Sequence, residues 1–295
     1  MSVSTAEIEY INLLKTVIEN GTKQSDRTGT GTYSIFGERL KFDLRNNTIP
    51  LLTTKRVYWK GVVEELLFFL KGITDNKYLQ DKDVHIWDGN TSREYLDKLG
   101  LNDRAVGDLG PCYGFQWRHF NAKYTNSGAD YSNKGVDQLA NAINLIKTDP
   151  TSRRIFVSAW NPEQLNEMCL PPCHVSFQFY VNVEKKELSY QMYQRSVDCF
   201  LGLPFNIASY GLLTHLVAKI CGLEAGDLII CMGNTHIYQN HIEQCKIQIS
   251  RLNEIREFPK LKIKQVRENI EDYEYADFEL IGYKPLSAIK ADMAV

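Results

Sequence analysis

The chain has 295 residues, of which 43% are apolar, and this is enough to build a hydrophobic core in one large domain or two smaller ones. A formal net charge of -2 excludes the strong positive field of a dedicated nucleic-acid-binding protein, although single arginines can still hold a small anion. The seven cysteines contain no C-x-x-C pair, which argues against a disulfide framework or a zinc ribbon and favours a reducing compartment.

The first predicted element is a helix. Ser4 and Glu7 form an S-x-x-E capping box, and Gly21 ends the helical pattern. The apolar stripe between them consists of Ile8, Ile11, Leu14 and Ile18. No apolar signal segment precedes this helix and no apolar run is long enough to span a bilayer, so we expect a cytoplasmic protein without a membrane partner.

Residues 27–44 combine Thr and Gly with alternating apolar positions, which predicts a loop that leads into a strand. The next helix, at 62–70, is apolar almost all round and is therefore buried, yet it carries Glu64 and Glu65 about 100° apart around its axis. Either both carboxylates form a solvated patch at the rim of the core, or one is buried and functional. Their position alone does not decide between these interpretations.

Helical and strand-like patterns then alternate, which predicts an α+β fold. Helices are expected at 136–147, 207–221 and 236–252, and strands at 154–159, 175–183, 188–195, 228–232 and 260–266. The short polar connection 184–187 predicts a β-hairpin, and the polar residues 124–134 predict a surface loop. Because no linker, internal repeat or low-complexity tract interrupts the pattern, we expect one domain over residues 1–295.

Cys173 is the candidate nucleophile. Two prolines precede it and preset the direction of the backbone. The predicted hairpin places Cys173 and residues 195–198 at the same end of the sheet, where the guanidinium of Arg195 favours thiolate over thiol. The alternative is an inert buried thiol, and this interpretation applies to every other cysteine of the chain as well.

Other types of site fit the sequence less well. A hydrolase pair of Cys173 and His174 is disfavoured because neighbouring residues of a strand point to opposite faces. His236 and His241 diverge by about 140° on the expected helix, unlike a pair of metal ligands. The Thr- and Gly-rich residues 28–32 match neither a dinucleotide nor a nucleoside triphosphate fingerprint.

Several arginines stand at the ends of expected loops or strands, where a forked guanidinium can bind a phosphate through two hydrogen bonds. They are Arg27, Arg153, Arg154 and Arg195. Any one of them is otherwise an ordinary surface arginine. Because adjacent strand residues point to opposite faces, Arg153 and Arg154 serve one ligand together only if the backbone there is irregular.

Taken together, a series of segments resembles the thymidylate synthase family in order and spacing. These segments are 27–31, 50–60, 64–67, 87–88, 107–118, 153–154, 171–174, 193–196, 203–209 and 236–238. The resemblance runs from about Arg27 to the terminal Val295, with 1–26 as a helical lead and 290–295 as a mobile tail. It implies a single domain with a mixed β-sheet that is covered by helices and forms the interface of a homodimer.

The resemblance also implies an activity, which is reductive methylation of dUMP to dTMP. Methylenetetrahydrofolate would give both the carbon and the hydride, which explains a redox step in a chain without a metal site or a nicotinamide or flavin fingerprint. Cys173 would add to carbon 6 of uracil and turn the ring into an enolate that attacks the folate methylene. The implied catalytic residues are Cys173, Glu65, Tyr113, Asn206 and Asp198.

Binding residues follow from the same resemblance. Those for dUMP are Arg27, Arg153, Arg154, Gln194, Arg195, Ser196, Asn206, His236 and Tyr238, with Arg153 and Arg154 supplied by the partner subunit. Those for the folate are Ile86, Trp87, Asn90, Asp198, Leu201, Gly202, Phe205 and Val295. Val197 and Asn234 depart from the residues usual in the family and leave the fine tuning of the pocket and of His236 open.

Two alternatives share these features. A nucleotide hydroxymethylase would let water capture the methylene intermediate, but the amide of Asn206 can both donate to a carbonyl and accept from a ring N–H, as uracil requires. A non-catalytic regulator that binds nucleic acid is opposed by the weak net charge and by the complete set of site residues. The sequence therefore favours the synthase.

Overall fold

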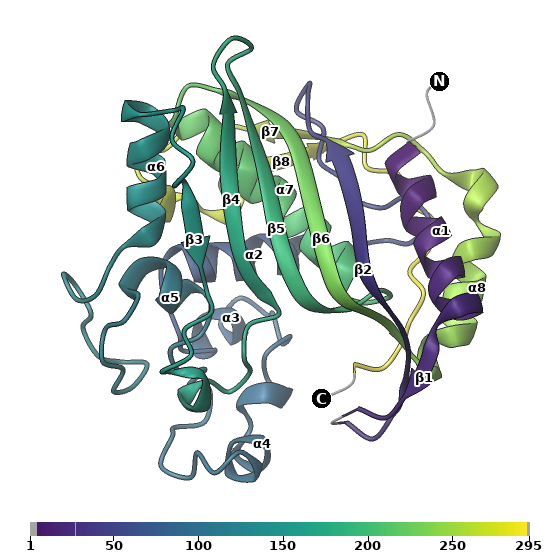
Figure 1. Ribbon diagram of the computed structural model, residues 1–295, viewed down its shortest axis with the longest axis horizontal. Coiled ribbons are helices and arrows are strands. Elements are labelled where there is room, and N and C mark those ends of the chain that lie inside the picture. Colours follow the sequence, from purple (N-terminus) through teal and green to yellow (C-terminus); the bar gives the residue numbers. More distant parts are fainter. Residues whose placement is uncertain (1–4, 27, 294–295) are drawn as a thin grey trace.

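A six-stranded sheet forms the centre of the computed structural model, which describes residues 5–26 and 28–293 (Figure 1). The strand order is β1-β2-β6-β5-β4-β3, and every neighbouring pair is antiparallel except β5 and β6. The bounds are β1 Thr22–Gln24, β2 Thr32–Asp43, β3 Phe156–Ser158, β4 His174–Asn182, β5 Glu187–Asp198 and β6 Glu224–Tyr238. The sheet is mixed, and the predicted α+β class is confirmed.

Helices cover one face of this sheet. In Figure 1, α2 and α7 lie behind the strands, while α1 and α8 lie together beyond β2. The bounds are α1 Thr5–Asn20, α2 Trp59–Leu70, α3 Lys77–Gln80, α4 Arg93–Lys98, α5 Gly114–His119, α6 Gln138–Thr148, α7 Gly202–Ile220 and α8 Ile242–Ser250. A separate antiparallel pair consists of β7 Lys260–Ile263 and β8 Phe278–Ile281.

The parallel pair β5 and β6 requires a crossover connection, and α7 supplies it. Apolar residues occur all round this helix, and it is therefore buried along nearly its whole length. It begins at Gly202, earlier than predicted, because Pro204 is tolerated in a first turn where the missing N–H costs no helical bond. The end of β5 and the start of α7 are thereby brought close together.

The helix predicted for residues 236–252 is wrong in its first part, since β6 continues to Tyr238 and α8 begins only at Ile242. Contacts with residues remote in sequence explain this difference. His236 pairs with Ser34 of β2 on one side and with Asp198 of β5 on the other. Strand neighbours on both sides outweigh the local helical pattern, as they commonly do.

The hairpin prediction is confirmed, because β4 and β5 pair antiparallel around the short connection. The first helix is confirmed as well, although Ser4 of the capping box lies outside the described residues. Of its predicted stripe, Ile11 and Leu14 are buried, whereas Ile8 and Ile18 are only half-buried. The buried face is rotated toward Tyr10, Leu13 and Val17.

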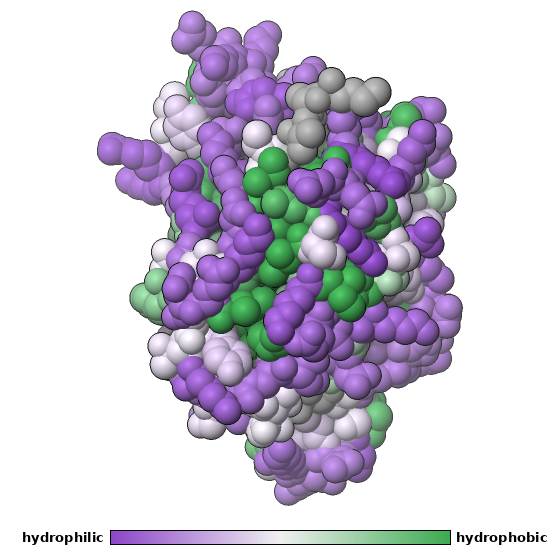
Figure 2. All heavy atoms as spheres, turned by 90° about the vertical axis from the view of Figure 1, so that its right-hand side faces the viewer, coloured by the Kyte–Doolittle hydropathy of each residue, from purple (hydrophilic) through white to green (hydrophobic). Residues whose placement is uncertain are grey.

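The second face of the sheet carries no helix over its centre in the described part of the chain (Figure 1). On this face Phe156 pairs with Gln178, which pairs with Gln191. Three large side chains stand exposed along it, with Tyr180 at 67%, Phe156 at 49% and Tyr193 at 44% exposure. Figure 2 shows another hydrophobic area, ringed by hydrophilic side chains, on the side of the molecule that bears α1 and α8.

Candidate active site

A cavity of about 460 Å³ lies at the carboxyl end of β5, beside the start of α7. In sheets with parallel strands, this is the edge where ligands bind. The predicted site residues that line it are Glu65, Ile86, Trp87, Asn90, Tyr113, Cys173, Gln194, Ser196, Asp198, Leu201, Gly202, Phe205 and Asn206. Segments far apart in the sequence thus converge on one chamber.

Cys173 lies in the bend just before β4, and Arg195 holds this bend in place. The Arg195 guanidinium donates to the carbonyl oxygens of Pro172 and Pro171, at 2.9 and 2.7 Å, and its backbone N–H donates to the carbonyl of Cys173 at 3.0 Å. The same guanidinium approaches the Cys173 Sγ at 4.0 Å. The predicted proximity of cation and thiol is therefore confirmed, and the cation also fixes the backbone that carries the thiol.

Tyr113 supports Cys173 from the other side. Its hydroxyl accepts a hydrogen bond of 2.8 Å from the backbone N–H of Cys173, and its ring stacks on Phe69 at 4.9 Å. The backbone of Tyr113 has a φ of 38°, which is strained for a residue with a side chain. Such strain persists only where the surroundings hold it, and it gathers at functional sites.

Glu65 is buried in α2 and faces the cavity. One carboxylate oxygen accepts a hydrogen bond of 2.8 Å from the indole N–H of Trp87. Burial raises the pKa of Glu65 to about 7, against the opposing effect of this hydrogen bond. Its neighbour Glu64 is buried too and pairs with Lys82 at 3.3 Å, so neither carboxylate forms the solvated patch that was one of the two interpretations.

His174 also lines the cavity, so the argument that it must point away from Cys173 is wrong. Cys173 precedes the strand, and the register between β4 and β5 shifts just after His174, so simple alternation does not apply. The imidazole Nδ1 instead lies 2.8 Å from the Tyr210 hydroxyl. Burial lowers the pKa of His174 to about 4, so the ring is neutral at physiological pH.

Polar groups of β5 and α7 complete the wall. Gln194 donates to the Asn206 Oδ1 at 2.9 Å. The Asp198 carboxylate accepts from the backbone N–H groups of Phe200 and Leu201, at 2.9 and 3.2 Å, and so shapes the entry into α7. Nearby, the buried Nδ2 of Asn90 has no hydrogen-bond partner among the described residues, which leaves a donor for a bound molecule.

His236 and Tyr238 lie at the end of β6, next to Asp198 in register, with their rings 5.2 Å apart. His236 Nδ1 is 2.9 Å from the Asn234 Oδ1, so Asn234 orients the ring, and burial lowers the pKa of His236. Because His236 is on a strand, the helical argument against a metal pair does not hold. The described residues contain no cluster of His, Cys, Asp and Glu arranged to hold a metal ion.

The model of the family described as thymidylate synthase matches residues 8–295. The chain belongs to the thymidylate synthase family. Human thymidylate synthase is 54% identical over 98% of this chain and 91% of its own length. A bifunctional dihydrofolate reductase-thymidylate synthase of Zea mays is 54% identical over 98% of the chain and 54% of its own length, and a probable thymidylate synthase of Schizosaccharomyces pombe is 52% identical over 99% and 48%.

The chain thus spans about half the length of several curated relatives that it matches. Against the full-length human thymidylate synthase it spans 91%. The family match begins at residue 8, earlier than the expected start near Arg27, so most of α1 lies within the region of similarity. No helix in the described ranges 5–26 and 28–293 is long and apolar enough to cross a membrane.

Some residues expected from the thymidylate synthase resemblance are not at the cavity. Arg153 and Arg154 are exposed in a turn before β3 and do not line it, so they are not on a regular strand either. Val197 is buried in the core and does not reach the chamber. Arg27 and Val295 lie outside the described residues.

Lys55 is the clearest residue of this thymidylate synthase chamber that sequence reasoning missed. It lines the cavity, its ammonium donates to the carbonyl of Phe200, and it lies 3.6 Å from the centre of that ring. Burial lowers the pKa of Lys55 to about 8, against the attraction of Asp198. The signal was present, since Lys55 falls inside the matching segment 50–60, but no residue of that segment was assigned a role.

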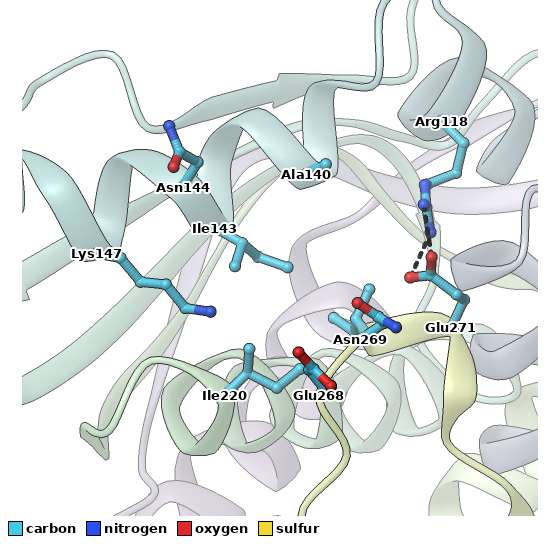
Figure 3. Close-up of a pocket in the computed structure, with 10 residues that line it drawn as sticks. Arg118, Ala140, Ile143, Asn144, Lys147, Ile220, Glu268, Asn269 and Glu271 are labelled. Atoms are coloured by element: carbon cyan, nitrogen blue, oxygen red, sulfur yellow. Dashed lines mark hydrogen bonds and ion pairs between the residues drawn. The ribbon is translucent and has the colours of Figure 1, made fainter. Parts of the chain in front are cut away.

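A second, smaller hollow lies elsewhere, among α6, the end of α7 and residues 268–271 (Figure 3). At one end Arg118 pairs with Glu271 at 3.2 Å, while Ile143 and Ile220 contribute apolar surface. None of the residues predicted for substrates lines this hollow. Most of the predicted site residues that the structure describes line the cavity beside β5 and α7 instead.

Proposed function

We propose that this chain converts dUMP to dTMP, with methylenetetrahydrofolate as carbon donor and reductant and dihydrofolate as second product. The observation that carries the proposal is the convergence of Cys173, Glu65 and Asn206 on one cavity in a member of this family. A thiol, a carboxylate with a pKa near neutrality and an amide are the groups that addition to a uracil ring requires.

Cys173 is the proposed nucleophile. Its sulfur would form a bond to carbon 6 of uracil, and the ring electrons would move to carbon 5 and the carbonyl oxygen as an enolate. Arg195 supports this role because its charge stands 4.0 Å from the Sγ and favours the thiolate. Its Nε and Nη2 donate to backbone carbonyls, and Nη2 also contacts the Sγ, so Nη1 is the group proposed to bind the phosphate of dUMP. Ser196 on the cavity wall is the proposed second phosphate contact.

Glu65 is the proposed organiser of proton transfers, with Tyr113 beside it. A pKa of about 7 means that the carboxyl group both holds and releases a proton near neutral pH. The proton of carbon 5 must leave after the new carbon–carbon bond forms, and the uracil carbonyl must be polarised. A buried carboxyl group in the same chamber as the thiol is suited to both tasks.

The folate is proposed to bind against the apolar and aromatic part of the wall. Ile86, Trp87 and Phe205 provide flat or apolar surface for a pterin, and Asn90 provides the unpartnered amide donor. Asp198, Leu201 and Gly202 lie beside them. Ile289 and Met293 bring the C-terminal segment to the mouth of the cavity, which supports the proposal that the tail 290–295, including Val295, closes over the ligands.

We propose a homodimer in which the open sheet face of each subunit meets the other. Exposed Tyr180, Phe156 and Tyr193 on this face support it, because aromatic side chains are enriched at interfaces. Arg153 and Arg154 are exposed beside the same face, outside their own chain's cavity, as residues that serve a partner's phosphate site would be. His236 and Tyr238 are the proposed contacts to the deoxyribose, and the cytoplasm is the proposed compartment.

The decisive experiment mixes the purified protein with dUMP and methylenetetrahydrofolate and follows dihydrofolate by its absorbance. Formation of dTMP and dihydrofolate in equal amounts is expected. Hydroxymethylated dUMP without dihydrofolate would instead indicate the hydroxymethylase, in which water captures the intermediate. No product of either kind would refute the proposal.

Two further experiments with variants sharpen this test. Cys173→Ser is expected to abolish turnover and to keep nucleotide binding. The control is Cys221→Ser, which removes a half-buried thiol at the end of α7 and should leave the rate unchanged. For the dimer, inactive Arg154→Ala and Cys173→Ser proteins are mixed and allowed to exchange subunits. Activity in the mixed dimers requires that a site takes its arginine from the partner subunit. Mixed dimers without any activity would contradict that arrangement.

A further inference from the structure

One face of α1 carries two buried polar side chains, Glu7 and Tyr10, and neither of them lines the cavity. They lie three residues apart and therefore point to the same side of the helix. Glu7 binds the backbone at residues 53–54, just before Lys55 of the cavity wall. Tyr10 contacts a part of the chain that is 189 residues away. A single helix face thus contacts two separate segments that lead into the cavity wall.

The second of these segments is the connection 199–201 between the end of β5 and the start of α7. The Tyr10 hydroxyl donates to the carbonyl oxygen of Cys199 at 2.9 Å, and the backbone N–H of Cys199 donates to the carbonyl of His236 at 2.8 Å. Because the connection belongs to neither a strand nor a helix, its buried backbone groups depend on such individual partners. Tyr10 is therefore one of the contacts that set the path of the chain between β5 and α7.

This connection also carries groups that are proposed to bind the folate. Asp198 at its start and Leu201 at its end line the cavity. The Asp198 carboxylate accepts from the backbone N–H groups of Phe200 and Leu201, and the carbonyl of Phe200 accepts from the ammonium of Lys55. A rotation of the preceding peptide, whose carbonyl Tyr10 holds, would move these donors and this acceptor relative to the cavity.

Gln248 of α8 joins the two contacts of α1 into one buried network. Its Nε2 donates to the Thr54 hydroxyl at 3.0 Å, and that hydroxyl donates to Glu7 at 2.8 Å. Its Oε1 lies 3.5 Å from the Tyr10 hydroxyl, which has one proton and places it in the shorter bond to Cys199. The four side chains of this network are fully buried where α1 and α8 pack together (Figure 1).

The groups proposed to bind the nucleotide are held by different contacts. Arg195 is held by the backbone carbonyls that precede Cys173, and Asn206 accepts a hydrogen bond from Gln194. Among the described residues, the hydrogen bonds of the α1 and α8 network reach none of these side chains. Loss of a contact in the network should therefore affect the folate side of the cavity first.

We propose that Tyr10 is a positioning residue for the folate: by donating to the carbonyl of Cys199, it fixes residues 198–202 on the folate side of the cavity without contacting a ligand. The ligand in this statement rests on the proposed function. Tyr10→Phe keeps the ring that fills the core but leaves the buried Cys199 carbonyl without this donor. The connection is then held less strictly, so the affinity for the folate falls and the affinity for dUMP does not.

The test compares Tyr10→Phe with Tyr124→Phe. Tyr124 is the matched control because its buried hydroxyl also donates a hydrogen bond, to Asp108 at 2.6 Å, and because neither partner lines the cavity. Calorimetry measures the affinity for dUMP, and then the affinity of the dUMP-saturated protein for dihydrofolate. Dihydrofolate has no methylene group to transfer, so no turnover takes place during the measurement. Urea unfolding gives the stability of each variant.

We expect the dissociation constant for dihydrofolate to rise about fivefold in Tyr10→Phe, within the range of one hydrogen bond, while the constant for dUMP stays within about twofold. In Tyr124→Phe both constants should equal those of the unaltered protein, although this variant also loses stability. An unchanged dihydrofolate constant in Tyr10→Phe, an equal loss of affinity for both ligands, or the same loss in Tyr124→Phe would overturn the proposal.

A different result decides about the proposed function. Unaltered protein that binds both ligands but forms no dTMP from dUMP and methylenetetrahydrofolate would refute the proposed function, and the binding constants would still decide the role of Tyr10. Unaltered protein that binds no dihydrofolate would overturn both proposals.

Discussion

Two buried carboxylates, Glu7 and Glu65, differ in how many hydrogen bonds they accept from the rest of the protein. Glu7 of α1 is fully buried and accepts from the backbone N–H and the hydroxyl of both Thr53 and Thr54, at 2.7 to 2.8 Å. Glu65 accepts one bond from Trp87 and turns to the cavity. Burial raises the pKa of both. The first therefore ties a helix to a loop, and the second keeps lone pairs for chemistry.

The largest expected effect tests the chemical role of Glu65. Glu65→Gln keeps the size of the side chain and its bond from Trp87 but removes the titrating group, so turnover should fall by about 10²–10⁴-fold. Steady-state rates with saturating dUMP and folate measure this. A rate within twofold of the unaltered enzyme would mean that Glu65, like Glu7, has only a structural role.

The next effect tests the structural role of Glu7. Glu7→Ala leaves buried N–H and hydroxyl donors of Thr53 and Thr54 without their acceptor, so the free energy of unfolding should fall by about 3 kcal/mol. Urea unfolding followed by fluorescence measures it. The turnover of the folded fraction should change much less than in Glu65→Gln, and a variant of unaltered stability would contradict the comparison.

A pH series separates the two residues further. The folded pKa of Glu65 is raised from the ordinary 4.5 to about 7, so the folded state holds more protons in this interval and stability is lost as the pH rises through it. Glu65→Gln does not lose stability in this way, so its free energy of unfolding at pH 8 should exceed that of the unaltered protein by on the order of 3 kcal/mol. Below pH 4.5 the two free energies of unfolding should be equal. An advantage independent of pH would refute the raised pKa.

The smallest expected effect concerns the hydrogen bond that Glu65 accepts from Trp87. Trp87→Phe removes an N–H donor that lowers the Glu65 pKa, so the acidic limb of the pH–rate profile should move toward higher pH by roughly one unit. Trp117→Phe is the matched control, since the indole N–H of Trp117 is buried without a hydrogen-bond partner among the described residues. Equal shifts in both variants would mean that the hydrogen bond is not responsible.

Sequence patterns predicted correctly those elements that depend on residues close together in the chain. The first helix, the buried character of α2 and the hairpin of β4 and β5 each follow from spacing that neighbouring residues impose. The hairpin alone brought Cys173 and Arg195 to the same end of the sheet, and the structure confirms their approach. By contrast, His236 was misplaced on a helix because its strand is defined by partners on β2 and β5 that are remote in sequence.

The sequence by itself determined the fold class, the family and most residues of the chamber, because order and spacing of matching segments carry that information. The resemblance had already singled out Glu65 over Glu64. Only the tertiary structure showed that Glu64 pairs with Lys82, and that His174 shares the chamber with Cys173. It alone placed the Tyr210 hydroxyl 2.8 Å from the imidazole Nδ1 of His174. The physical reason is that burial and hydrogen-bond direction depend on neighbours that residue spacing does not reveal.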